Sequence, residues 1–430
     1  MNAEIISVGT ELLLGDIVNT DAQFLGRELA ALGITVLRQH VVGDNHARLR
    51  ELVLEAKERC DLLVFSGGLG PTADDLTKET VAECYRDSLR FDPEEWDKIT
   101  GYFSAMGRPT PENNRKQAMV PVRGRKLPNA NGTAPGAWFE DGAKLAVLLP
   151  GPPHELKPLW KEQVLPLLTA RQDCVLHSLV LRAAGIGESD AEQRVGHLFK
   201  NANPTAAIYA KPGEMQIRIT ARAADVETAR QMCRAYAQNF YELLGDDIFG
   251  EDGEDLEHRV VHLLGERGLT AATAESCTGG MVAQRITNVS GASEVFGFGF
   301  VTYANAAKER LLGVDPAVLE QYDAVSSQTA AQMAFGAAKN AGADLGLATT
   351  GFAGPGGGIP GKPVGTVYTA VSLEDRVYIC RLDLGGRSRE NVRRRAAQAV
   401  LDMARRLLEQ RPIPGAKCFA RGELADFENA

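Results

Sequence analysis

The chain has 430 residues, 44% of them hydrophobic and 24% charged, which is the composition of an ordinary globular protein with two or three domains. Its formal net charge of -9 argues against a protein that binds DNA or RNA directly through a basic surface. No apolar run approaches the length of a membrane span, and no charged-then-apolar leader follows Met1. The seven cysteines are scattered without a C-x-x-C pair, as in proteins with reduced thiols. We therefore expect a cytoplasmic protein without a membrane segment.

The first domain, predicted to span residues 1–170, alternates apolar strands with amphipathic helices. This β-α-β-α-β order is typical of a doubly wound parallel sheet with helices on both faces. Ligands of such sheets bind beyond the carboxyl ends of the strands. The expected strands are residues 4–8, 35–41 and 62–65, the expected helices are residues 22–32 and 47–58, and residues 9–15 are expected to be a loop.

A glycine-rich loop, Ser66–Thr77, follows the third expected strand. Its glycines and hydroxyl let backbone amides approach a phosphate closely, and its two aspartates open the next helix. Carboxylates beside a phosphate suit a divalent cation, whereas capping of the helix alone would not need the glycines. The candidate phosphate-binding residues are Gly67, Gly68, Gly70 and Thr72, and the candidate metal ligands are Asp74 and Asp75.

Two further turns of the first domain carry polar residues. Asn131–Gly136 is one of them, and Asn131 is a candidate substrate contact. The other follows a buried strand at residues 145–149 and ends at Glu155, which is either a third metal ligand or an ordinary residue of a helix start. Residues 92–119 are expected to form helices outside the sheet.

The middle of the chain, residues 171–252, is predicted to be a small α+β domain that connects its neighbours and carries no catalytic constellation. The acidic residues 246–257 are expected to be a linker into a last domain at residues 253–415, and residues 416–430 are expected to be a flexible tail. The expected strands of the middle domain are residues 175–181, 206–209 and 215–220, and its main helix is residues 228–244.

The last domain opens with a strand that runs into the turn Ala274-Glu-Ser-Cys-Thr-Gly-Gly280, after which a helix is expected from about Thr278 to Thr287. Free amides at such a turn, together with the helix dipole, can hold a phosphate or an oxyanion, and the turn can position a serine for attack. The alternative is an ordinary capped turn, since serine and threonine are favoured N-caps. Cys277 also lies at this helix start, but it is equally well a small buried residue.

The first domain resembles the molybdopterin-binding type of domain in the CinA family. The resemblance rests on Gly9-Thr-Glu-Leu-Leu-x-Gly15, Ser66-Gly-Gly-Leu-Gly-Pro-Thr-x-Asp-Asp75, Asn131-Gly-Thr-Ala-Pro-Gly136 and Leu149-Pro-Gly-Pro-Pro153. It implies a three-layer doubly wound sheet of the MoaB/MogA type that hydrolyses the pyrophosphate of ADP-ribose with a divalent metal of the Mg, Mn or Co class. The same fold binds molybdopterin in other proteins, so fold alone does not select the substrate.

The last domain resembles the other half of that family, the PncC-type nicotinamide mononucleotide amidohydrolase domain. The matching motifs include the turn at residues 274–280, Val301-Thr-Tyr-Ala-Asn-Ala-Ala-Lys308, Thr350-Gly-x-Ala-Gly-Pro355 and Pro363-Val-Gly-Thr-Val367. The resemblance implies an α/β domain that deamidates nicotinamide mononucleotide (NMN) to nicotinic acid mononucleotide and ammonia, without a cofactor. Together the two resemblances cover nearly the whole chain and imply a bifunctional enzyme of pyridine-nucleotide salvage.

A second turn with hydroxyl groups, at residues 288–294, contains Ser293. The residues of this domain support a hydrolase of the Ser/Lys/Tyr type, because no histidine lies near this turn or near the turn with Ser276. Lys308 is the candidate base, with Tyr303 orienting or relaying. The nucleophile is Ser276 or Ser293, with a small preference for Ser293, which would leave Ser276 at the phosphate or oxyanion. The remaining candidate substrate contacts of this pocket are Glu275, Thr278, Gly279, Gly280, Thr350, Gly351 and Arg389.

Two other functions stay open. The competence association of the CinA name implies a partner module for DNA uptake and recombination, and the acidic charge suits a protein partner better than DNA. A molybdopterin-binding protein is the second alternative. The family also implies a homodimer, and we expect small nucleotides as the ligands and neither a membrane nor a nucleic acid as a direct partner.

Overall fold

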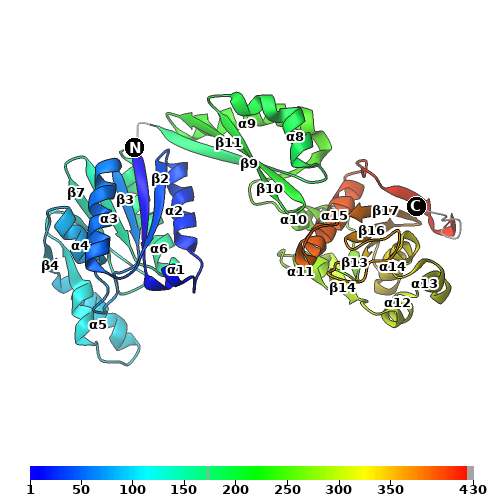
Figure 1. The fold of residues 1–430 in the computed structure, drawn as a ribbon, viewed down its shortest axis with the longest axis horizontal. Helices are drawn as coiled ribbons and strands as arrows, with labels where there is room; N and C mark the ends of the chain where they lie inside the picture. The colour runs from blue at the N-terminus through cyan, green and yellow to red at the C-terminus, as the bar shows by residue number, and fades with distance from the viewer. Residues whose placement is uncertain (172–173, 424–430) are drawn as a thin grey trace. The chain divides into compact units, whose positions relative to one another are not determined.

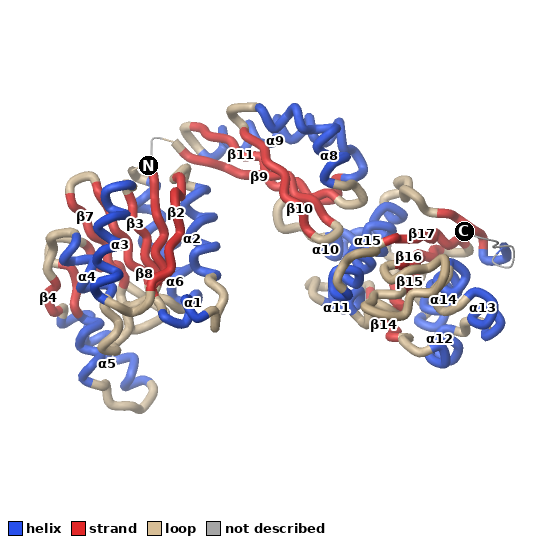
Figure 2. Tube along the Cα trace, viewed as in Figure 1, coloured by secondary structure: helices blue, strands red, loops and turns tan. Residues whose placement is uncertain are grey.

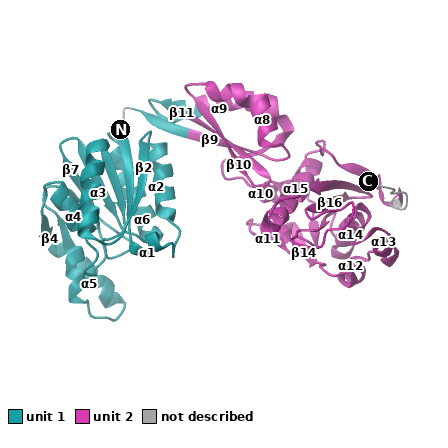
Figure 3. Ribbon diagram, in the orientation of Figure 1, with its two compact units in different colours: residues 1–177, 221–231 teal, residues 178–220, 232–430 magenta. Residues whose placement is uncertain are grey.

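The computed structural model describes residues 1–171 and 174–423. They form two compact units, one of residues 1–177 with 221–231 and the other of residues 178–220 with 232–430 (Figure 3). None of the helices within the described residues is both long enough and apolar enough to cross a membrane.

The N-terminal domain is built on a six-stranded sheet in the order β2-β1-β3-β8-β7-β6 (Figures 1 and 2). The strands from β2 to β8 run parallel, as predicted, and β7 and β6 extend the sheet antiparallel. The strands are β1 (Asn2–Val8), β2 (Thr35–Val42), β3 (Leu62–Ser66), β6 (Arg125–Leu127), β7 (Gly136–Asp141) and β8 (Lys144–Leu149), beside the separate pair β4 (Leu89–Phe91) and β5 (Met119–Pro121).

Helices cover both faces of this sheet, which gives the expected three layers (Figure 1). Apolar side chains of α2 and α6 pack on one face and those of α3 and α4 on the other. The predicted loop after β1 contains one correction, because residues 10–14 form the short helix α1. The helical segments are α1 (Thr10–Leu14), α2 (Thr20–Ala31), α3 (His46–Arg59), α4 (Thr77–Cys84), α5 (Pro93–Ala105), η1 (Glu112–Ala118), α6 (Pro153–Leu159), η2 (Trp160–Val164) and α7 (Leu165–Thr169).

The middle domain is a four-stranded sheet in the order β10-β11-β9-β12 with its helices on one face (Figure 1). Its last strand corrects the sequence prediction, because β12 lies inside the expected linker and pairs antiparallel with β9. Four residues are too few for a periodic signal, so the acidic flanks dominated the prediction. The elements are β9 (Val175–Ala183), α8 (Glu188–Val195), η3 (Gly196–Lys200), β10 (Thr205–Lys211), β11 (Glu214–Ala223), α9 (Val226–Leu244), η4 (Gly245–Asp247) and β12 (Ile248–Glu251).

The C-terminal domain has a six-stranded sheet in the order β14-β13-β15-β16-β17-β18, with β14, β13 and β15 parallel and the rest antiparallel. Helices α10, α11 and α15 pack on one face, and α12, α13 and α14 pack on the other. The elements are α10 (Leu256–Arg267), β13 (Ala271–Glu275), α11 (Met281–Thr287), η5 (Ala292–Glu294), β14 (Phe296–Val301), α12 (Asn305–Leu312), α13 (Pro316–Tyr322), α14 (Ser327–Ala341), β15 (Leu345–Gly351), β16 (Thr366–Leu373), β17 (Arg376–Asp383), α15 (Arg389–Leu408), β18 (Lys417–Ala420) and η6 (Arg421–Glu423).

The expected flexible tail is partly ordered. Its residues 417–420 form β18, which pairs antiparallel with β17, and Ala416 packs against the core of the C-terminal domain. The strand has only four residues and follows a Pro-Gly pair, so periodicity gave no signal for it. Residues 424–430 of the predicted tail lie outside the described residues.

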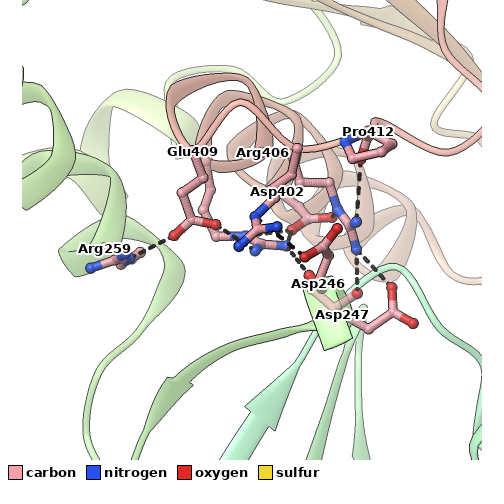
Figure 4. A network of polar contacts seen from close by, with 10 residues as sticks. Asp246, Asp247, Arg259, Asp402, Arg406, Glu409 and Pro412 are labelled. Carbon is pink, nitrogen blue, oxygen red and sulfur yellow. Dashed lines mark hydrogen bonds and ion pairs between the residues drawn. The ribbon is translucent and has the colours of Figure 1, made fainter. Parts of the chain in front are cut away.

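A buried ionic network joins the end of α15 to the turn before β12 (Figure 4). The guanidinium groups of Arg405 and Arg406 are 1% and 2% exposed, and both bind the carboxylate of Asp402. Arg406 also binds the carboxylate of Asp247 at 2.8 Å, and Arg405 donates to the backbone oxygen of Asp246 at 3.0 Å. These contacts fix the middle domain on the last helix of the C-terminal domain.

Candidate functional sites

The N-terminal domain contains a cavity of about 680 Å³ beyond the carboxyl ends of its parallel strands, where the sheet topology predicts a ligand. The glycine-rich loop forms one wall. A Cβ at Gly67 would lie 2.2 Å from the backbone oxygen of Val8, and one at Gly68 would lie 2.0 Å from the Thr77 hydroxyl oxygen. Both residues also have positive φ, so only glycine fits there. The predicted residues that line the cavity are Gly67, Gly68, Gly70, Thr72, Asp74, Asp75 and Glu155.

The two aspartates of the loop share one threonine. The Thr72 hydroxyl lies 2.5 Å from a carboxylate oxygen of Asp75 and also contacts the carboxylate of Asp74. This hydrogen bond lowers the pKa of Asp74 below its usual range. Lys116 contacts the same turn, since its ammonium group donates to the backbone oxygen of Thr72 at 3.3 Å. The loop therefore presents two carboxylates to the cavity, while the ammonium group of Lys116, on η1, contacts the backbone of the loop.

Glu155 lies in the wall of the cavity, whereas Asn131 does not. Glu155 lines the cavity, but its carboxylate accepts a hydrogen bond from the Asn129 side chain at 2.7 Å. Asn131 is not among the residues that line the cavity, and its backbone amide donates to Asn129 at 3.0 Å. Asn129, rather than Asn131, is thus the asparagine that organises this wall.

Two acidic residues of the cavity escaped sequence reasoning. Asp44 binds both the amide and the hydroxyl of Thr10, at 3.0 and 2.8 Å. Asp21 lines the cavity with one buried carboxylate oxygen that has no partner within the described residues, and burial raises its pKa. A signal existed in both cases, because each aspartate follows a predicted strand or opens a predicted helix at the ligand edge of the sheet.

The donor set fits a divalent metal only in part. Within the described residues no three side chains of His, Cys, Asp or Glu are grouped to hold a metal ion. Magnesium typically takes one or two carboxylates and completes its shell with water and substrate phosphates. Asp74 and Asp75 meet that requirement at the cavity edge, whereas Glu155 is not gathered with them. A preformed three-carboxylate site is therefore not present.

In the C-terminal domain, the structure brings Lys308 against Ser276. The ammonium nitrogen of Lys308 lies 3.3 Å from the Ser276 hydroxyl oxygen, 2.9 Å from the backbone oxygen of Thr302 and 3.3 Å from that of Tyr303. Lys308 is 1% exposed, and this burial lowers its pKa. A lysine that is desolvated and surrounded by neutral oxygens loses its proton more easily than one in water, so it can act as a base toward the serine.

The turn that contains Ser276 binds its own glutamate. The carboxylate of Glu275 accepts hydrogen bonds from the backbone amides of Gly280, Val282 and Ala283 at 2.8 to 3.0 Å. The expected anion site at this helix start is therefore filled by a side chain of the protein, and Glu275 is a helix cap rather than a substrate contact. The helix itself begins at Met281 rather than at Thr278, because Gly279 and Gly280 have positive φ.

Two threonines predicted to contact the substrate are fully buried. The Thr278 hydroxyl bonds to that of Thr349 at 2.6 Å, and the Thr350 hydroxyl donates to the backbone oxygen of Ala324 at 2.6 Å. Gly351 lies within β15, where a Cβ would come within 2.8 Å of the neighbouring β16 backbone. These contacts hold the turn at residues 274–280, β15 and the segment before α14 together.

Arg389 and Tyr303 meet on the exposed side of the site. One guanidinium nitrogen of Arg389 lies 3.2 Å from the Tyr303 hydroxyl, and another donates to the backbone oxygen of Gly354 at 2.7 Å. Sequence reasoning missed Arg393, which lies one turn further along α15 and donates to the backbone oxygens of Cys277 and Thr278. The arginines at residues 389 and 393–395 carried a signal, but long basic side chains are usually solvated, and the sequence alone does not show which of them turns toward the site.

Ser293 is not part of this cluster, which corrects the preference for it. Strands β13 and β14 are parallel, with Ala271 opposite Phe296 and Glu275 opposite Val301. Ser276 follows the carboxyl end of β13, while Ser293 lies before the amino end of β14. At a rise of about 3.3 Å per residue, the two serines are therefore roughly 16 Å apart along the strand direction. Within one chain Ser293 cannot attack a substrate held at Lys308.

Cys277 is not a reactive thiolate. It is 3% exposed, and burial raises the pKa of its thiol to about 12. The thiol therefore stays protonated near neutral pH, in line with a structural role.

The N-terminal domain thus carries a cavity on a doubly wound sheet, and the C-terminal domain carries a serine–lysine contact on a mixed sheet. With the small α+β domain that lies between them in the chain, they define a three-domain α/β protein. Comparison with protein families agrees with this class. Residues 4–170 match the model described as "Probable molybdopterin binding domain", residues 178–250 match the "Damage-inducible protein CinA KH domain", and residues 253–408 match the "CinA C-terminal domain". The chain belongs to the CinA family, as its motifs predicted.

Full-length relatives support the assignment. A CinA-like protein of Kosmotoga olearia is 48% identical over 409 residues, which cover 95% of this chain and 99% of the relative. A competence-damage inducible protein of Moorella thermoacetica is 48% identical over 93% of this chain and 97% of its own length. The crystal structure of a competence/damage inducible protein from Agrobacterium tumefaciens is 41% identical and covers 36% of this chain and 94% of its own, with a TM-score of 0.35.

Proposed function

We propose that the C-terminal domain is a serine-lysine amidohydrolase that converts NMN to nicotinic acid mononucleotide and ammonia. The observation that carries the proposal is the buried contact of Lys308 with Ser276, because a lysine of lowered pKa beside a serine is the minimal base and nucleophile for amide hydrolysis. The motifs of the family, and its matching C-terminal model, make NMN the first substrate to test.

The proposed reaction uses neutral Lys308 as the base. Its amine takes the proton from the Ser276 hydroxyl while the serine oxygen attacks the carboxamide carbon. The carbon–nitrogen bond then breaks, and Lys308 returns the proton so that ammonia leaves. Lys308 then takes a proton from water, the hydroxide breaks the acyl–oxygen bond of the acyl-serine, and Lys308 returns that proton to the Ser276 oxygen, which leaves the acid product. Arg389 is the exposed cation of the site and suits the phosphate of the nucleotide.

The test is ammonia release from NMN by the full chain. Ser276→Ala and Lys308→Met are expected to lower kcat by roughly a thousandfold or more, as loss of a nucleophile or its base does elsewhere. Lys339→Met, which changes an exposed lysine on α14, is the matched control and is expected to leave kcat unchanged. Full activity of Ser276→Ala would overturn the assignment of the nucleophile.

Ser293→Ala separates the two serines. We expect it to keep its activity, because Ser293 lies at the far end of β14. If Ser293→Ala is inactive instead, the serine must come from a second copy of the chain. Mixing inactive Ser293→Ala with inactive Lys308→Met would then restore part of the activity, because each copy would supply what the other lacks.

We infer a second activity for the N-terminal domain, hydrolysis of the pyrophosphate bond of ADP-ribose. Glycine amides and the aspartates of one loop line a single cavity, as phosphates and a divalent ion require. When bound, the ion would neutralise phosphate charge beside Asp74 and Asp75, while the glycine amides hold the phosphate oxygens. Asp75→Asn is expected to abolish metal-dependent release of AMP and leave NMN deamidation unchanged; undiminished release of AMP would refute the role of Asp75.

A further inference from the structure

A second cavity, of about 460 Å³, lies between the middle domain and α15. The middle domain contributes the turn before α8 and the β10–β11 hairpin, and the C-terminal domain contributes β17 and α15. Much of its wall is apolar, with Ile186, Met215, Leu382, Leu384 and Met403 among the lining residues. A cavity of this size, with an apolar wall and few polar groups, is typical of a site for a small organic molecule.

Two buried N–H groups of α15 at this cavity have no acceptor. Gln398 is 6% exposed, and its side-chain nitrogen has no partner within the described residues. Its side-chain oxygen accepts from Arg285 at 2.8 Å; because arginine only donates, this contact fixes which end of the amide is unpaired. The buried Nε of Arg395, three residues earlier on the same helix face, also has no partner among the residues that the structure describes.

An unpaired buried donor costs free energy, and an unpaired buried cation costs more. Burial lowers the pKa of Arg395, and nearby Arg387 acts in the same direction. Two unpaired donors at i and i+3 of one helix, one of them on a cation, therefore favour an acceptor that carries negative charge.

The acidic residues of the wall do not supply that acceptor. Glu214 binds a buried arginine through both carboxylate oxygens, and Asp402 is held by the two arginines of the ionic network (Figure 4). Glu188 is the remaining carboxylate of the wall, which also contains the two cations Arg395 and Lys211. Neither of these cations has an ion pair within the described residues.

We propose that this cavity binds a small organic anion with an apolar or aromatic body and a single anionic group. The body fits the apolar wall, and the anionic group accepts from Arg395 and Gln398. The site is distinct from both candidate catalytic sites, so the inference is independent of the proposed activities.

The test uses 8-anilinonaphthalene-1-sulfonate, an aromatic sulfonate that fluoresces when bound, with the full chain. We expect saturable binding that benzoate displaces and inorganic phosphate, which has no apolar body, does not. Arg395→Met is expected to weaken binding by roughly 10- to 100-fold, as loss of a hydrogen bond to a charged group does. Gln398→Glu keeps the acceptor for Arg285 but replaces the donor with a charge, and is also expected to weaken binding by at least about tenfold.

Arg394→Met is the matched control, because Arg394 is the preceding residue of the helix, is exposed and is paired with Glu390. Equal affinity of Arg395→Met and Arg394→Met, or no displaceable binding by the wild type, would overturn the proposal. A thermal melt distinguishes a structural role of Arg395 from a role in ligand binding. If Arg395 only held the two domains together, Arg395→Met would lower the melting temperature of the ligand-free protein, whereas we expect no decrease.

Discussion

Substitution of Asp402 tests the ionic network that fixes the middle domain on α15. In Asp402→Asn the side chain keeps one acceptor, but two guanidinium groups that are 1% and 2% exposed lose a shared carboxylate. Removing one partner of a buried ion pair costs about 3–5 kcal/mol. We expect a value near 3 kcal/mol, at the lower end of that range. The reason is that Arg405 keeps Glu409 at 2.9 Å and Arg406 keeps Asp247 at 2.8 Å.

The assay is a thermal melt with two signals. In a unit of this size 1 kcal/mol corresponds to about 2–4 °C, so the far-UV circular dichroism transition of Asp402→Asn is expected to fall by about 6–12 °C. Tryptophan fluorescence gives an internal reference, because the three tryptophans lie at positions 96, 138 and 160 of the N-terminal domain. All partners of Asp402 lie in residues 178–220 and 232–423, so the tryptophan transition is expected to stay in place.

The control for this substitution is Glu390→Gln, which breaks an exposed pair with Arg394 on the same helix. Exposed pairs contribute about 0–1 kcal/mol, so its melting temperature is expected to stay within roughly 4 °C of the wild type. Equal shifts for Asp402→Asn and Glu390→Gln would show that burial of the network does not carry the stability, and would refute the reasoning.

Three other predictions follow from buried charged groups. Burial lowers the pKa of Lys308, and only its neutral amine accepts a proton. We therefore expect kcat/KM for NMN to rise with pH and to reach a plateau below the ordinary lysine pKa of 10.5. A profile that still climbs at pH 10.5 would contradict this. Glu275→Ala leaves the three amides that it caps without an acceptor and is expected to cost about 1–3 kcal/mol in urea denaturation, while Glu275→Gln, which keeps one acceptor oxygen, is expected to cost less. Burial also lowers the pKa of Lys78 to about 8, so between pH 8 and 10.5 the unfolded chain binds more protons than the folded one. The free energy of unfolding, followed by tryptophan fluorescence, is therefore expected to rise over that pH range. Lys78→Met is expected to remove the part of the rise that Lys78 contributes.

Regular elements with clear periodicity were predictable from the sequence. The prediction of α3 at residues 47–58 is confirmed within one residue at each end, and the parallel strands around β1 and β3 are confirmed within one or two residues. Apolar periodicity determines such elements locally, so no knowledge of the partner segments is required. Short or edge elements, such as β12 and β18, depend on a pairing strand that the local sequence does not reveal.

The candidate sites divide along the same line. The glycine-rich loop of the N-terminal domain was predictable, because a strand end, glycines and aspartates follow one another in the chain. The capping role of Glu275 was missed because its carboxylate reaches amides five to eight residues ahead, a geometry that only the folded turn creates. Ser293 was misplaced because a hydroxyl-bearing turn looks alike at either end of a strand, and only the sheet shows which end it occupies.

Helix α15 has 20 residues and carries three sets of contacts along its length: Arg389 and Arg393 at its start, Arg395 and Gln398 at the second cavity, and Asp402 with its arginines at its end. At 3.6 residues per turn, one inserted residue rotates everything beyond it by about 100° and advances it by about 1.5 Å. No single insertion between Arg393 and Asp402 can therefore keep both ends engaged. The length of α15 between these sets of contacts is therefore fixed as strictly as the identity of the side chains that make them.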